Sequence, residues 1–70
     1  MTSIPAVETK ILASAVTRGM IISIPVCPRL EVERITDEYG FLFFDNGRGR
    51  SVVVDYADLI EPLGYFNPEN

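Results

Sequence analysis

Few residues in this chain can do chemistry. Its 70 residues include a single cysteine and no histidine. Without histidine, neither a serine nor a cysteine nucleophile can be activated by the usual imidazole base. A zinc site needs about four nitrogen or sulfur ligands, and Cys27 has no such companions. We therefore expect no catalytic residues, no metal site and no cofactor, and we predict that the protein is not an enzyme.

Two carboxylates, Glu31 and Glu33, lie two residues apart in an alternating run. Strand geometry would place them on one face, roughly 7 Å apart, a spacing compatible with acid–base chemistry or calcium binding. The same pattern is typical of the wet face of a half-buried strand, which is the interpretation we prefer. Cys27, between Pro25 and Pro28, is expected to be a small buried hydrophobic residue.

Arginines indicate a possible anionic partner. Arg48 and Arg50 belong to a Gly-Arg-Gly-Arg hairpin loop and can donate bidentate hydrogen bonds to phosphate. Arg34 would extend this surface, with Tyr39 and Phe41 for stacking, if folding brings them together. The candidate nucleic-acid contacts are therefore Arg34, Arg48 and Arg50. The alternative is a hairpin with solvated arginines, since useful affinity needs several phosphate contacts.

Charge is unevenly distributed along the chain. Six basic and ten acidic residues give a net charge of −4. Residues 1–50 are neutral overall, so the acidic excess falls entirely in residues 51–70. The acidity argues against a general nucleic-acid coat and favours solubility. The 47% hydrophobic content is too high for a disordered chain.

No segment predicts export or membrane insertion. The first seven residues lack the basic and apolar regions of a signal peptide. No apolar run approaches the roughly 20 residues that span a bilayer. A single cysteine suits a reducing compartment. We expect a cytoplasmic protein without membrane contact, located in the host cytoplasm if a phage encodes it.

The elements that must position these residues are short strands. Alternating hydrophobicity predicts strands at 20–26, 29–36 and 50–56, and an unbroken apolar run predicts another at 41–44. Turns are expected at 37–40 and 45–49. Residues 10–16 fit either a short strand or a helical turn. Pro25 indicates an edge strand or a bulge, and a parity slip near Glu33–Arg34 indicates a bulge or bend. Pro62 limits residues 57–60 to one helical turn.

We predict a mainly β fold, a small curled barrel of four to five short antiparallel strands with one helical turn near 57–60. Such strands are stable once they close around one core, unlike an isolated hairpin. The domain would cover residues 10–66, between an N-terminal tail at 1–9 and a C-terminal tail at 67–70. An α+β alternative requires a true helix over 9–17.

The order of these elements resembles known small barrels. The segments that carry the resemblance are Val16–Ile22, Leu30–Ile35, Gly40–Phe44, Ser51–Val54 and Asp58–Ile60. Their layout is similar to SH3-like barrels of the translation-protein and KOW type, and to small accessory proteins of actinobacterial phages. The resemblance covers roughly residues 11–64 and implies an SH3-like barrel. The chain lacks the basic loop of the KOW type and the aromatic groove of signalling SH3 domains, so neither activity is carried over.

Apolar residues exceed what one small core needs. Residues 41–44 are all apolar, yet alternate side chains leave a strand on opposite faces. One face should therefore be core and the other an apolar interface. The candidate interface residues are Ile21, Leu42, Phe44, Val53, Tyr65 and Phe66. The alternative is that residues 63–66 fold back and cover this face.

These features predict a non-enzymatic protein-interaction module that self-associates or binds a partner protein, such as a phage accessory or host-directed factor. One alternative is a nucleic-acid-associated barrel that uses the arginine-bearing hairpin. Another is a structural subunit of a larger assembly such as a virion. We expect no small-molecule substrate.

Overall fold

Seven antiparallel strands and one short 3-10 helix make up the computed structural model, which describes residues 10–68. The strands are β1 (Ile11–Leu12), β2 (Met20–Ile24), β3 (Cys27–Glu31), β4 (Arg34–Glu38), β5 (Phe41–Asp45), β6 (Ser51–Asp55) and β7 (Leu59–Tyr65). The helix, η2 (Ala13–Ala15), follows β1 directly, so the segment 10–16 contains both a strand and a helical turn. The predicted mainly β, antiparallel fold is confirmed. The predicted tail at 1–9 lies outside the described residues, as do residues 69–70.

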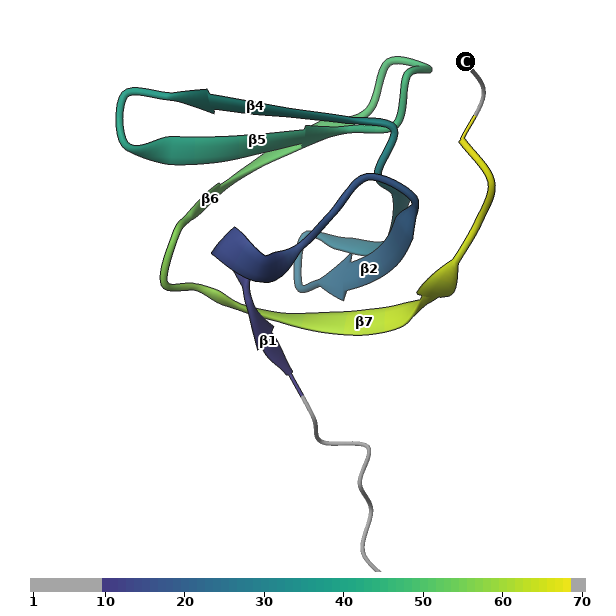
Figure 1. The fold of residues 1–70 in the computed structure, drawn as a ribbon, viewed down its shortest axis with the longest axis horizontal. Coiled ribbons are helices and arrows are strands. Elements are labelled where there is room, and N and C mark those ends of the chain that lie inside the picture. Colours follow the sequence, from purple (N-terminus) through teal and green to yellow (C-terminus); the bar gives the residue numbers. More distant parts are fainter. Residues whose placement is uncertain (1–9, 69–70) are drawn as a thin grey trace, which may run out of the picture.

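The strands form two sheets, seen in Figure 1 on opposite sides of the molecule. One has the order β1-β7-β2-β3 and the other the order β4-β5-β6. The chain turns from one sheet into the other between β3 and β4. There the Val32 N–H donates to the Met20 carbonyl (2.9 Å), while the next N–H, that of Glu33, donates to the Asp45 carbonyl (2.8 Å). This corner lies beside the bend predicted near Glu33–Arg34, and it splits the predicted strand 29–36 into two.

The first predicted strand is shorter than expected. β2 ends at Ile24, Pro25 and Val26 form a turn, and Cys27 begins β3 instead of ending β2. Proline suits this turn because it has no N–H to leave unpaired. The pairing of β2 with β3 shifts register between Ile22 and Ile24, which is the kind of irregularity that a proline in the run predicts.

The helical turn predicted near 57–60 is wrong. The Asp58 N–H donates to the Asp55 carbonyl (3.0 Å), and the Asp58 carboxylate accepts from the Asp55 N–H (2.9 Å). These bonds close a tight turn, after which Leu59 begins β7. Pro62 lies inside this strand, beside a register shift in the pairing with β2, where a missing N–H is tolerated. This strand and the split at the corner explain why the strand count exceeds four to five.

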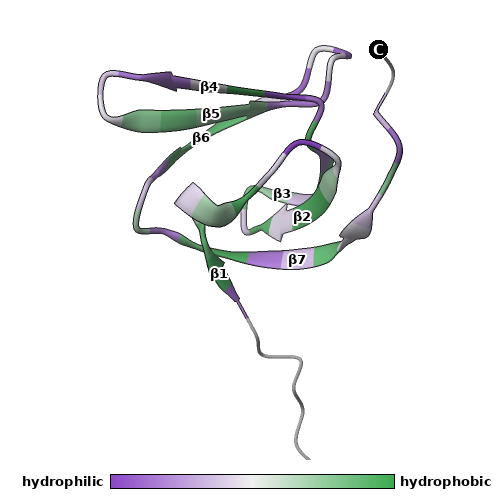
Figure 2. Ribbon diagram, viewed as in Figure 1, coloured by the Kyte–Doolittle hydropathy of each residue, from purple (hydrophilic) through white to green (hydrophobic). Residues whose placement is uncertain are grey.

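The core lies between the two sheets and contains only apolar residues. Its largest fully buried side chains are Phe44, Ile22, Leu30, Ile60 and Val32. Figure 2 shows hydrophobic residues concentrated along β5 and hydrophilic ones at the outer end of β4. Among residues 10–68, no charged or polar side chain is buried. The fold therefore leaves every charged side chain of the described residues at or near the surface.

Candidate functional site

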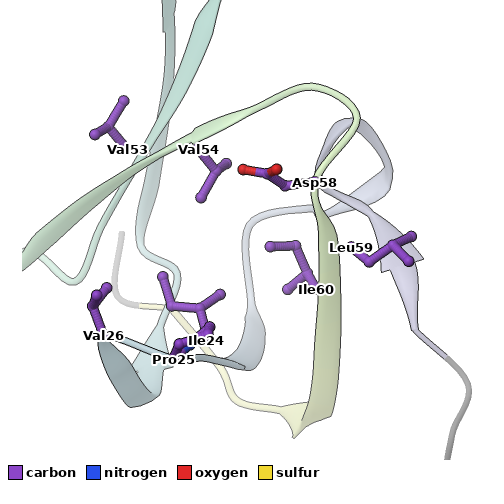
Figure 3. Close-up of a pocket in the computed structure, with 8 residues that line it drawn as sticks. All are labelled: Ile24, Pro25, Val26, Val53, Val54, Asp58, Leu59 and Ile60. Carbon is purple, nitrogen blue, oxygen red and sulfur yellow. The ribbon is translucent and has the colours of Figure 1, made fainter.

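An apolar groove opens beside β6, between the turn that joins β2 to β3 and the start of β7 (Figure 3). Its volume is about 360 Å³. The residues that line it are Ile24, Pro25, Val26, Val53, Val54, Asp58, Leu59 and Ile60. Ile24, Val54 and Ile60 are buried, whereas Val26, Val53 and Leu59 are 78%, 54% and 61% exposed. The apolar groove is thus a gap between the two sheets that leads from an exposed apolar rim to the core.

The edge of β6 next to this groove carries unpaired backbone groups. β6 is the last strand of its sheet, and the Asp55 N–H and carbonyl bond Asp58 instead of β5. In an antiparallel strand every second residue directs its backbone groups to the same side. Ser51 and Val53 therefore direct their N–H and carbonyl groups to the same edge as Asp55. No strand of the described chain pairs with this edge.

The other edge strands are protected against pairing. β3 contains Pro28 and Arg29, β4 carries charges at both ends, and β1 has only two residues. Prolines and charges are common devices that block the addition of a strand. β6 reads Ser-Val-Val-Val-Asp, with neither proline nor charge before its last residue. Among the strands that the structure describes, β6 therefore has the most receptive edge.

Three of the predicted interface residues belong to the interior. Leu42 is 7% exposed, Phe44 is fully buried and Ile21 is 8% exposed. Leu42 pairs with Val54 and Phe44 with Val52, so these residues of β5 and β6 share the core-facing side. Ile21 lies in β2, which has a paired neighbour on each side. These three side chains cannot form a surface, and assigning them to the interface was wrong.

The remaining predicted interface residues are not gathered in one patch. Val53 is exposed on β6, whereas Tyr65, 73% exposed, lies at the end of β7 in the other sheet. Phe66 is half-buried, and its N–H donates to the Gly19 carbonyl. Residues 63–66 therefore follow β2 and leave Val53 exposed, which is not the predicted fold-back.

The outward-facing apolar residues that sequence reasoning missed are Phe41 and Phe43. Phe43 pairs directly with Val53, and Phe41 is 43% exposed. Phe41 and Phe43 alternate with the buried Leu42 and Phe44. The predicted second apolar face therefore exists, but Phe41 and Phe43 form it instead of Leu42 and Phe44. The register of the hairpin, in which Asp45 pairs with Ser51, is the signal that would have assigned the phase.

A second candidate site is an arginine hollow with a volume of about 390 Å³. It is lined by Arg29, Asn46, Arg48, Gly49 and Arg50. Glu31 connects the two segments, because its Oε2 pairs with Arg29 Nη2 (3.3 Å) and its Oε1 with Arg48 Nη2 (2.8 Å). Arg50 Nη1 approaches the Cys27 sulfur at 3.6 Å. Arginines from β3 and from the loop after β5 therefore meet at one place.

Asn46 holds the loop that carries two of these arginines. Its Oδ1 accepts hydrogen bonds from the backbone N–H groups of Arg48 (2.7 Å) and Arg50 (3.0 Å). Its own N–H donates to the Arg50 carbonyl at 3.0 Å. The Asp45 carboxylate accepts from the Gly47 N–H. The loop is thus tied together by its own polar groups, which fixes where Arg48 and Arg50 emerge.

The predicted arrangement of Arg34 with aromatic residues is not formed. Arg34 is exposed on β4 opposite Asp45 and does not line the arginine hollow. Tyr39 and Phe41 lie at the other end of the β4–β5 hairpin. Arg29 takes the place expected for Arg34, and sequence reasoning missed it. The available signal was the alternation of β3, which puts Arg29 and Glu31 on one face.

The remaining polar groups make contacts with their neighbours. Glu31 is engaged by arginines. No group of three or more potential metal ligands occurs among the described residues. A hydrogen bond to the Asp37 carboxylate raises the pKa of the Tyr56 hydroxyl, and burial and the negative charge of Asp37 raise it further. This contact joins the end of β6 to β4 and is structural.

No family model, curated protein or solved structure matches this chain. None of the helices in residues 10–68 is long and apolar enough to cross a membrane. The two surfaces described above are therefore the basis for inferring a function.

Proposed function

We propose that this chain is a non-enzymatic interaction module that pairs with a second copy of itself through the edge of β6. The observation that carries this proposal is the row of unpaired backbone groups at Ser51 and Val53, next to the apolar groove. Such an edge is a template for an added strand. Main-chain hydrogen bonds then supply affinity, while adjacent apolar pockets supply specificity.

The charges around β6 favour a second copy as the added strand. Arg48 and Arg50 precede β6, whereas Asp55 and Asp58 lie at its other end. Antiparallel pairing of two β6 strands places the basic end of one beside the acidic end of the other. Opposite charges closer than the Debye length of about 8 Å attract each other whether or not they lie on the same face of the sheet. A copy added in parallel would instead bring like charges together.

The hydrogen bonds between Asp55 and Asp58 indicate the register of this pairing. Asp55 already uses its N–H and carbonyl within its own turn, so only Ser51 and Val53 remain available. Pairing is complete when Ser51 of one copy faces Val53 of the other, with Val52 at the twofold axis. The result is one continuous sheet with three strands from each copy. The apolar grooves then lie next to each other across the axis.

The biological setting that we propose is the one implied by the resemblance to SH3-like barrels and phage accessory proteins. A curled antiparallel barrel is consistent with an SH3-like module, and self-pairing suits an accessory or host-directed factor of a phage. The Cys27 thiol is free and buried, which is consistent with a reducing compartment such as the cytoplasm. The same edge would serve if the copies assembled within a larger structure.

Sedimentation equilibrium over a wide concentration range tests the pairing. The wild-type chain should approach twice its monomer mass of 7.8 kDa. Val53→Pro removes an N–H that points away from β5, so it costs no internal hydrogen bond but blocks the added strand. This variant should remain a monomer with an unchanged circular dichroism spectrum. Val53→Thr keeps the N–H and a branched side chain, and as the matched control it should still dimerise.

A charge exchange tests the antiparallel orientation. Arg50→Glu and Asp55→Lys should each weaken self-association, because each places like charges at positions 50 and 55, which lie near each other across the antiparallel pair. An equal mixture of the two variants should recover dimers, since every acidic end then meets a basic one. A wild-type chain that stays monomeric at all concentrations would contradict the proposal. Unchanged dimerisation of Val53→Pro would contradict it as well.

A further inference from the structure

The arginine hollow concentrates positive charge on a chain whose net charge is −4. Arg29, Arg48 and Arg50 contribute three guanidinium groups to it. Within residues 10–68, Glu31 is the one carboxylate that forms ion pairs with them. These three guanidinium groups and Glu31 together carry a charge of +2, while the Asp45 carboxylate binds the Gly47 N–H of the same loop and the Glu33 side chain lies beside Gly47. This positive charge lies apart from the apolar groove, and the packing of the core does not require it.

The guanidinium groups are held before any ligand arrives. The two carboxylate oxygens of Glu31 orient Arg29 and Arg48 separately, at 3.3 and 2.8 Å. Asn46 fixes the backbone on both sides of Gly49 through its bonds to Arg48 and Arg50. Arg50 contacts the weakly accepting sulfur of Cys27, and no carboxylate pairs with it in the described part of the chain. Within a single chain its donors are therefore available to an anion.

The shape of the hollow suits a small ligand. Its volume of about 390 Å³ exceeds that of one ion. Gly49 has a positive φ of 97°, and a Cβ at this position would meet no atom within 4 Å. The backbone is thus open to solvent where the two loop arginines emerge. No aromatic side chain lines the hollow, so it offers no surface on which a nucleic-acid base would stack.

We propose that the arginine hollow binds the dianionic phosphate group of a small phosphomonoester. A phosphomonoester carries a charge of about −1.5 to −2 at neutral pH, which is opposite in sign to the net charge of the three guanidinium groups and Glu31. Its oxygens accept the paired, planar donors that guanidinium groups present. A phosphodiester in a nucleic-acid backbone carries only one negative charge and matches this site less well.

Nuclear magnetic resonance titration of the full chain tests this site with three probes at physiological ionic strength. The probes are inorganic phosphate, a nucleoside 5′-monophosphate and an oligonucleotide without a terminal phosphate. The first two should shift the amide signals of residues 29–31 and 46–50 saturably. The affinity of the nucleoside monophosphate should rise as pH increases through about 6, where the second proton of a phosphomonoester leaves. The oligonucleotide should bind about tenfold more weakly, because hydrogen bonds to a more highly charged acceptor are stronger.

Two variants separate a built site from general attraction. Arg50→Gln should weaken phosphate binding about tenfold or more, as expected for the loss of charged hydrogen bonds. Lys10→Gln removes the same charge outside the hollow and should leave binding unchanged. Equal weakening by both variants, tighter binding of the oligonucleotide, or absence of saturation would overturn the proposal. Repeating the titration in Val53→Pro, which keeps every arginine, separates phosphate binding from self-association.

Discussion

Phe44 is the largest fully buried side chain of the core. It projects inward from β5 opposite Val52, while Phe43, the next residue back, is half-buried on the other face. The two phenylalanines are chemically identical neighbours, so their difference in burial comes only from the phase of the strand. Phase therefore decides which of them stabilises the fold and which is available to a partner.

Replacing each phenylalanine with alanine tests which of the two side chains packs in the core. Phe44→Ala should cost about 3–5 kcal/mol, because it removes a fully buried ring and leaves a cavity. That loss is comparable with the whole stability of a small domain, about 5–15 kcal/mol, so the variant should be largely unfolded or strongly destabilised. Phe43→Ala should cost much less. Urea unfolding followed by circular dichroism compares them, and a larger effect of Phe43→Ala would mean that β5 has the opposite phase.

The turn of the hairpin between β4 and β5 contains a tyrosine in a strained backbone conformation. Glu38 pairs with Phe41, so Tyr39 and Gly40 form a two-residue loop. Their φ angles are 55° and 81°, the pattern of a type I′ turn, in which both central residues have positive φ. Glycine adopts such angles readily, whereas tyrosine does so at a cost of roughly 1 kcal/mol. Tyr39 is 90% exposed and gains little packing in return.

Relief of this strain should stabilise the protein. Tyr39→Asn places a residue that tolerates positive φ before Gly40 and should gain about 0.5–1 kcal/mol. For a domain of this size, 1 kcal/mol corresponds to about 4–8 °C in Tm, so thermal unfolding resolves the gain. Tyr39→Ala removes the ring but keeps the strain, and it should give no comparable gain. Equal stabilisation by both variants would assign the effect to the loss of the ring.

At the scale of the whole molecule, small size and the open edge act together. A chain this short buries only about 60% of the surface that its unfolded form exposes, which makes a lone domain marginal. The apolar groove adds an opening between the two sheets beside an unpaired strand edge. Pairing of two copies would close both defects at once. The arginine hollow lies before the start of β6, so the same strand separates two surfaces of different chemistry.

Stability should consequently depend on protein concentration. A partner that binds only the folded form stabilises it by mass action, so the Tm of the wild-type chain should rise as its concentration increases. The Tm of Val53→Pro should not change over the same series, since its edge cannot pair. Scanning calorimetry of both proteins provides the comparison. A wild-type Tm that is independent of concentration would mean that pairing contributes nothing to stability.

Much of the fold could be predicted because short-range chemistry specifies it. Alternation identified β6, an unbroken apolar run identified most of β5, and glycine and asparagine marked the loop after Asp45. The end of the chain was harder. Pro62 indicated the end of a helical turn at 57–60, yet pairing with β2 carries the strand β7 past that residue. A pattern of residues cannot show such pairing, because it depends on strands about 40 residues apart.

By itself, the sequence determined which side-chain groups are present and where the chain bends. The absence of histidine excluded the common catalytic arrangements, and the parity slip near Glu33–Arg34 located the corner between the sheets. Only the tertiary structure decided which phase of residues 41–44 faces the core, since all four are apolar. It also decided which arginines meet, because Glu31 joins Arg29 and Arg48 only after folding. Turns depend on neighbouring residues, whereas burial and charge proximity depend on strands that are distant along the chain.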